Sequence, residues 1–241
     1  MRHLAPAPDA TPADWIVTAL RTFAQSVTSL VPSGFESYVR VFHPAYRERG
    51  LERTRVSWAE IAAAGGKRVH SAMQLPAFTG SDHLEDECPG VFDNAPEVGS
   101  LPPELAGSLT ATLVRHTATP ETCWFAVWDG WGGLRTEVRG APTFRLPGRE
   151  YHLLTAAVDA VPANVEGPLE QTPNLWWPED RAWCVATEID LNTTYIGCSD
   201  ACRDRILALP EIEALPIDPA TGIDIGSDLL NAFDKPTDNK S

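Results

Sequence analysis

The sequence contains no long hydrophobic run and no recognisable export signal. None of its apolar stretches approaches the roughly 18 consecutive residues that a membrane-spanning helix requires. Residues 1–12 are rich in alanine and proline and lack the apolar segment of a signal peptide, so we expect them to form a flexible leader. The five cysteines are an odd number and do not indicate a disulfide framework. We therefore expect a cytoplasmic protein with reduced thiols and no membrane contact.

Motifs for nucleotides, cofactors and common hydrolases are also missing. Gly65–Lys67 have the glycine and lysine of a phosphate-binding loop, but Arg68 follows where serine or threonine is required. Gly130–Gly133 do not open a helix, as dinucleotide-binding glycines do, and no Gly-x-Ser-x-Gly motif occurs. The sequence thus predicts no cofactor and identifies no catalytic residue.

Charge is unevenly distributed along the chain. The formal net charge is −14, and residues 150–241 carry 17 acidic and 5 basic side chains. This negative region repels phosphate backbones, so we expect no nucleic-acid binding, and a basic or neutral protein suits it better as a partner. Residues 40–68 have the opposite balance, with seven basic and three acidic side chains. We expect this segment to pair with the acidic region, with an anionic partner as the alternative.

Hydrophobic residues make up 43% of the chain, enough to build a core at this length. The apolar spacing predicts a helix over 13–30. A short helix is expected after Ser57, because Glu60 three residues later completes a capping box. Two more helices are predicted to begin at the capping residues Ser108 and Asp200.

The strongest β pattern begins at residue 122. Residues 122–128 are rich in β-formers and end at Asp129-Gly130, a dipeptide typical of hairpin turns. Further strands are predicted over residues 35–42, 134–138, 143–146, 151–157, 182–189 and 193–196. Helices flank this run of strands, which predicts an α+β fold with a mostly antiparallel sheet of about five to six strands. We expect a single domain over 13–209 and an acidic, partly ordered tail over 210–241.

Several segments combine tryptophan, glycine and acidic residues in a distinctive way. They are Gly34–Tyr38, Trp128–Gly132, Trp176–Cys184, Thr187–Asp190 and Thr194–Gly197. Together they resemble an uncharacterised family of soluble proteins from high-GC bacteria, over most of the chain. That resemblance implies no activity. A looser resemblance is to a superfamily of immunity and adaptor proteins, which combine a mixed sheet with helices and bind other proteins.

Three clusters contain residue types that bind metals or perform chemistry. The loop His83–Cys88 has metal-ligand types, with a solvated acidic loop as the alternative. Cys198 and Cys202 share a helix face, where the helix N-terminus would lower a thiol pKa, but a zinc site lacks a second pair and we expect structural thiols. Glu188 and Asp190 share a strand face, and such a pair usually faces solvent.

The eight tryptophans are the most informative residues. Adjacent residues of a strand point to opposite sides, so Trp176 and Trp177 cannot both face one core, and we expect one of them to be exposed. Trp131 follows the predicted turn, and Arg181 lies close in sequence to the Trp176-Trp177 pair. Because tryptophan and arginine dominate interface energetics, these four residues predict a protein-recognition patch, with simple core packing as the alternative.

These observations predict a non-enzymatic protein-binding domain of immunity or adaptor type. A small-molecule hydrolase, or another enzyme with an unfamiliar active site, is the alternative, and a structural subunit of a larger assembly is a third hypothesis. Neither the partner nor the oligomeric state follows from the residues.

Overall fold

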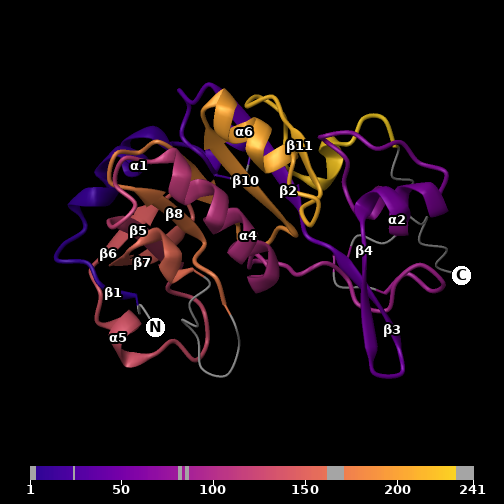
Figure 1. Cartoon of the computed structure of the whole chain (residues 1–241), viewed down its shortest axis with the longest axis horizontal. Helices are drawn as coiled ribbons and strands as arrows, with labels where there is room; N and C mark the ends of the chain where they lie inside the picture. The colour runs from indigo at the N-terminus through magenta and orange to yellow at the C-terminus, as the bar shows by residue number, and fades with distance from the viewer. Residues whose placement is uncertain (1–3, 24, 81–82, 85–86, 162–170, 232–241) are drawn as a thin grey trace, which may run out of the picture.

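The computed structural model describes residues 4–23, 25–80, 83–84, 87–161 and 171–231. These residues form a nine-stranded sheet, shown in Figure 1, and a separate two-stranded hairpin. The strands of the large sheet are β1 (Ala5–Pro6), β2 (Ser37–Phe42), β5 (Cys123–Trp128), β6 (Thr143–Leu146), β7 (Arg149–Ala156), β8 (Leu175–Pro178), β9 (Cys184–Ala186), β10 (Thr193–Cys198) and β11 (Ala214–Pro216). Their order is β1-β7-β5-β8-β9-β10-β2-β11, and β6 also pairs with β7.

The predicted α+β class with a mostly antiparallel sheet is confirmed. Every pairing among the described strands of the large sheet is antiparallel. The sheet has more strands than expected because β1, β8 and β11, which are only two to four residues long, were not predicted. Strands this short leave no readable alternation in the sequence.

Helices cover both faces of the sheet. They are α1 (Asp14–Ala19), α2 (Trp58–Ala64), α3 (Pro76–Thr79), α4 (Pro103–Leu113), α5 (Thr136–Arg139) and α6 (Asp200–Leu207), with 3-10 turns η1 (Thr11–Ala13), η2 (Val27–Ser29), η3 (Val114–His116), η4 (Val158–Ala160) and η5 (Ile225–Ser227). On one face Leu109 of α4 and Ile206 of α6 share a core with Phe125. On the other face Ile16 of α1 and Val27 of η2 share a core with Trp177.

Strand β5 shows why this sheet needs two covered faces. Phe125 and Val127 belong to the core beneath α4, whereas Trp124 and Ala126 belong to the core beneath α1. All four are buried. An apolar run without polar alternation is typical of a strand buried on both sides. The sequence of β5 therefore requires covering segments above and below it.

The hairpin of β3 (Ala45–Arg49) and β4 (Glu52–Val56) projects at one end of the molecule next to α2, as Figure 1 shows. The predicted capping box of α2 is confirmed, since Ser57 Oγ accepts from the Glu60 backbone and Glu60 Oε2 accepts from the Ser57 backbone. A third apolar core lies here, formed by Phe42, Ala45, Val56, Trp58, Ile61, Met73, Leu75 and Phe92. Of the basic segment, Arg55 reaches the C-terminal region, donating to the backbone oxygen of Glu211 at 3.3 Å.

Both ends of the chain join the fold further than the sequence predicts. The flexible leader predicted over residues 1–12 is wrong for its described part, because Ala5–Pro6 pair with β7 and Ala7 is buried. In the acidic tail, Ala214–Pro216 pair with β2. Further on, the side chain of Asn231 binds both the backbone N–H and the backbone oxygen of Arg68 at 2.9 Å. Residues 232–241 of the predicted tail lie outside the described residues.

Two predicted elements have a different structure. The helix predicted over 13–30 ends at Ala19, and hydrogen bonds between Ser26 and Ser29 start a separate 3-10 turn. Serine side chains compete with a continuing helix by binding the local backbone in this way. The strand predicted over 134–138 is largely the helix α5. Leu134 and Val138 are four residues apart and both buried, which suits one face of a helical turn as well as it suits a strand.

Two helix starts also lie elsewhere than predicted. Ser108 is in the middle of α4, which begins at Pro103 instead. Proline is favoured in the first turn because its missing N–H is not needed there. The cap of the last helix is Ser199, whose hydroxyl accepts from the backbone of Cys202, so Asp200 is the first residue of the helix.

Candidate functional site

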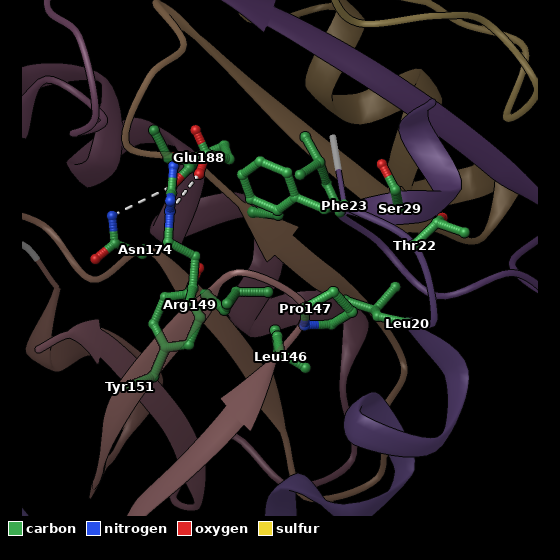
Figure 2. Close-up of a pocket in the computed structure, with 14 residues that line it drawn as sticks. Leu20, Thr22, Phe23, Ser29, Leu146, Pro147, Arg149, Tyr151, Asn174 and Glu188 are labelled. Carbon is green, nitrogen blue, oxygen red and sulfur yellow. Dashed lines mark hydrogen bonds and ion pairs between the residues drawn. The ribbon is translucent and has the colours of Figure 1, made fainter. Parts of the chain in front are cut away.

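A cavity opens where the turn between β6 and β7 meets the N-terminal segment and the loop after β9. The empty space between its walls is about 390 Å³ when the open solvent at its mouth is counted, and the enclosed part is much smaller. Its lining is apolar on one side and polar on the other, and includes Leu20, Phe23, Leu146, Pro147, Arg149, Tyr151, Asn174 and Glu188. Figure 2 shows Phe23, Arg149 and Glu188 lying next to one another. We call the cluster of Phe23, Trp128, Arg149, Glu188 and Asp190 the Arg149 site.

Arg149 is held by two carboxylates of the same loop. Its Nε donates to Glu188 Oε1 at 3.0 Å, and its Nη2 donates to Asp190 Oδ2 at 2.6 Å. The third nitrogen, Nη1, donates to the backbone oxygen of Gly148 at 3.3 Å. The three nitrogens therefore all have partners within the chain, and the guanidinium is fixed in position.

Two aromatic rings complete the surroundings of the guanidinium. Its central carbon lies 4.8 Å from the ring centre of Phe23 and 5.8 Å from that of Trp128. Both distances are within the range of cation–π attraction. Phe23 is 44% exposed although it is a large apolar residue, and Trp128 is half-buried. The site thus presents aromatic surface to solvent.

Two glycines allow the rings to lie close to the backbone. Gly148, in the β6–β7 turn, has a φ of +75°, and a Cβ there would lie 2.9 Å from Cδ2 of Phe23. Gly130 follows the end of β5, and a Cβ on it would overlap the indole of Trp128. A larger residue at either position would displace a ring, and at Gly148 it would also strain the backbone.

Glu188 is the buried acid of the site. Only 5% of its side chain is exposed, compared with 72% for Asp190, and its Oε2 accepts from the backbone N–H of Asp190 at 2.6 Å. Burial raises the pKa of the Glu188 carboxyl above its usual value, and the bonds from Asp190 and Arg149 act in the opposite direction. The prediction of a shared strand face is wrong, and the expectation that the pair faces solvent holds for Asp190 but not for Glu188. β9 ends at Ala186, and the loop after it turns Glu188 inward towards Arg149.

Trp131 contacts Trp128 of the site and the neighbouring Asn174. Its Nε1 donates to Asn174 Oδ1 at 3.2 Å, and its ring meets that of Trp128 edge-on with centres 5.5 Å apart. Asn174 also accepts from the backbone of Trp128 and donates to the backbone oxygens of Gly99 and Thr187. This buried amide therefore connects β5, β8 and the loop carrying Glu188.

The structure does not assemble the predicted patch of Trp131, Trp176, Trp177 and Arg181. Trp176 and Trp177 do point to opposite faces, but each is at most 1% exposed because both faces carry a core. Arg181 follows β8 and lies over the ring of Trp15 at 5.2 Å, whereas Trp131 bonds to Asn174, the residue before β8. Of the four residues, Trp131 alone is near the Arg149 site.

Sequence reasoning missed Phe23, Trp128 and Arg149 as site residues. Phe23 lies within the helix predicted over 13–30, which ends before it, and Trp128 is the last residue of the strand predicted over 122–128. The useful signal was the Pro147-Gly148 turn directly before an arginine, which places that side chain at a strand end. The sequence offers nothing to show that Phe23 lies beside this turn.

The nearest approach to a nucleophile and base is a different group, at the end of β2. Thr194 Oγ1 lies 2.9 Å from His43 Nε2, and His43 Nδ1 lies 2.7 Å from the backbone oxygen of Glu97. That carbonyl can only accept, so Nδ1 carries the proton and Nε2 accepts from the threonine. Both side chains are completely buried, and burial lowers the pKa of His43 to about 4. This pair is part of the core.

The described residues contain no group of three or more histidine, cysteine or acidic side chains that could hold a metal ion. Within the predicted loop His83–Cys88, residues 85 and 86 lie outside the described part of the chain. Cys198 and Cys202 are both buried. A hydrogen bond with Cys202, together with burial, raises the pKa of the Cys198 thiol, opposite to the expected effect of the helix N-terminus.

No family model matches the chain, and neither a curated protein nor a solved structure matches it. In the described part of the chain, no helix combines the length and apolar character needed to cross a membrane.

Proposed function

We propose that this chain is a non-enzymatic protein-binding domain of immunity or adaptor type, active in the cytoplasm, which binds a basic or neutral protein through the Arg149 site. The observation that carries the proposal is the exposed ring of Phe23, 44% accessible, stacked on an arginine that two carboxylates hold in place. Aromatic residues and arginine supply most of the energy of protein interfaces.

Pre-organisation of the site supports the same function. Arg149 is fixed by Glu188, Asp190 and Gly148, and Phe23 lies against Gly148. A partner would therefore meet rings and charges that need little further ordering. Binding that requires less ordering of side chains retains more of its interaction free energy.

The charge of the surrounding chain supports a basic or neutral partner. Residues 150–241 carry 17 acidic and 5 basic side chains, and two of these acids belong to the site. A negative surface attracts positively charged proteins and speeds their association.

Affinity capture with the full chain as bait, followed by identification and purification of the captured protein, tests this function. The wild type is then compared with Phe23→Ala in direct binding by calorimetry. Loss of a central aromatic residue should weaken binding by about 10-fold or more, corresponding to more than about 1.4 kcal/mol.

The matched control is Leu229→Ala, which also shortens an exposed apolar side chain, 88% accessible, in the C-terminal segment. Binding by this variant should equal that of the wild type. A purified partner whose affinity is the same for Phe23→Ala and the wild type would contradict the proposed function of the site.

A further inference from the structure

The Arg149 site contains one positive and two negative side chains. Each guanidinium nitrogen of Arg149 already donates within the chain, to Glu188, to Asp190 or to the backbone of Gly148. An anionic group of a partner would have to compete with two carboxylates for the same arginine. The site is therefore poorly suited to an acidic ligand.

The most accessible charged group of the site is the carboxylate of Asp190. The Asp190 side chain is 72% exposed. Arg149 contacts its Oδ2, and no described residue donates a hydrogen bond to its Oδ1. Glu188 lines the cavity, but only 5% of its side chain is exposed and both of its carboxylate oxygens already accept hydrogen bonds within the chain. A group that lies against Asp190 meets an accessible carboxylate oxygen, so it has to donate hydrogen bonds or carry positive charge.

The walls of the cavity suit an alkyl stem. Leu20, Leu146, Pro147 and Phe23 are among the apolar residues that line it. Lysine and arginine bury their methylene chains against apolar surface and place their charge at its edge. A cationic head is also attracted to an aromatic face such as that of Phe23.

We propose that the Arg149 site receives a lysine or arginine side chain of a protein partner, with its stem against Phe23 and Leu146 and its charged head at the exposed carboxylate of Asp190. This inference rests on the proposed function, because it specifies what the partner inserts into the Arg149 site. A neutral partner residue and an acidic segment are the occupants that it excludes.

The test uses the isotope-labelled full chain and three soluble probes, namely acetyl-arginine amide, acetyl-lysine amide and acetyl-citrulline amide. Citrulline has nearly the shape of arginine without its charge. Binding is followed by magnetic resonance through the indole N–H signals of Trp128 and Trp131, which lie next to each other at the site. Saturable shifts are expected with the two cationic probes, at millimolar affinity and weaker at high salt. Citrulline should bind at least about fivefold more weakly than arginine.

Two matched variants locate the cation. Asp190→Asn removes the exposed carboxylate of the site, and Asp204→Asn removes one that pairs with Arg203 in α6 and is similarly exposed, at 67%. Asp190→Asn should weaken binding of the arginine probe by about two- to fivefold, the effect of one exposed ion pair. Asp204→Asn, which makes the same change in net charge, should leave it unchanged.

The proposal is overturned if citrulline binds as tightly as arginine, or if the two variants weaken arginine binding equally. Failure of the proposed function looks different. If partner binding is weakened by Phe23→Ala but unchanged by Asp190→Asn, the proposed function is supported and the insertion of a basic side chain is contradicted. If the cationic probes bind at the indoles but a partner binds Phe23→Ala as tightly as the wild type, the site binds cations and the proposed function is wrong.

Discussion

Arg40 and Arg149 both lie against aromatic rings, but the chain treats them in opposite ways. The Arg40 guanidinium lies 4.9 to 5.6 Å from the ring centres of Phe42, Trp58 and Tyr195, and the residue is 1% exposed. No carboxylate of a described residue lies within 4.0 Å of it. Its Nη1 donates instead to the backbone oxygens of Ser71 and Met73, at 2.9 and 2.7 Å, and burial lowers its pKa.

The Arg149 guanidinium has two carboxylates, two rings and access to solvent. The comparison teaches that an arginine among aromatic rings is not in itself a recognition site. Arg40, a residue of β2, is buried and donates to backbone carbonyls in the core. Arg149 instead fixes the position of side chains at the surface. Exposure and nearby carboxylates distinguish the two roles.

The largest expected effect is the loss of stability on removing the buried Arg40 side chain. Arg40→Ala should lower the free energy of unfolding by about 3–5 kcal/mol, because it leaves a cavity and two carbonyls without donors. Arg149→Ala should cost only about 1–2 kcal/mol, because Asp190 and Gly148 are exposed to water and the buried carboxyl of Glu188 keeps the hydrogen bond from the Asp190 backbone. Urea unfolding of both variants measures the difference. Equal losses would show that the two arginines do the same structural work.

The pH dependence of stability tests the buried His43, which packs near Arg40. Because burial lowers the pKa of His43 from 6.5 to about 4, the unfolded chain binds more protons between these values. Stability supplied by neutral His43 is present above pH 6.5 and is lost as the pH falls towards 4, by on the order of 3 kcal/mol. Arg40 strengthens the shift and Glu104 opposes it.

The control for this series is His43→Gln, which has no titrating ring. Subtracting its unfolding free energy from that of the wild type, pH by pH, isolates the histidine from the many carboxyls of the chain. The difference should shrink as the pH falls from 6.5 to 4. Parallel curves for the two proteins would contradict a buried, neutral His43.

The smallest expected effect comes from Glu188 in the Arg149 site, and its pH dependence has the opposite sign to that of His43. Because burial raises the pKa of Glu188, the folded chain binds the extra proton just above pH 4.5, and the contribution of this carboxyl to stability falls as the pH rises through the raised pKa. Glu188→Gln should differ from the wild type by about 1 kcal/mol at pH 7. Its stability relative to the wild type should improve from pH 4 to pH 7, as measured by urea unfolding. A relative stability that falls over this range would contradict the raised pKa.

Much of the local structure could be read from the sequence, because it depends on neighbours along the chain. The capping box of Ser57 and Glu60 uses residues three apart, and the β5 pattern lies within six residues. The errors occurred where one pattern suits two structures. Leu134 and Val138 fit a strand or a helical turn, and Ser26 and Ser29 interrupt a helix that apolar spacing alone would continue.

By itself the sequence determined the antiparallel strands, the capped helix and the opposed faces of Trp176 and Trp177. Tertiary structure alone decided which segments cover each face of the sheet and which rings remain in solvent. Ile16 of α1 and Val27 of η2 share a core with Trp177 on one face of the sheet, and Phe23, which lies between these two elements in the chain, reaches Arg149. Whether a side chain is exposed depends on segments far away in the chain, and a local pattern carries no record of them.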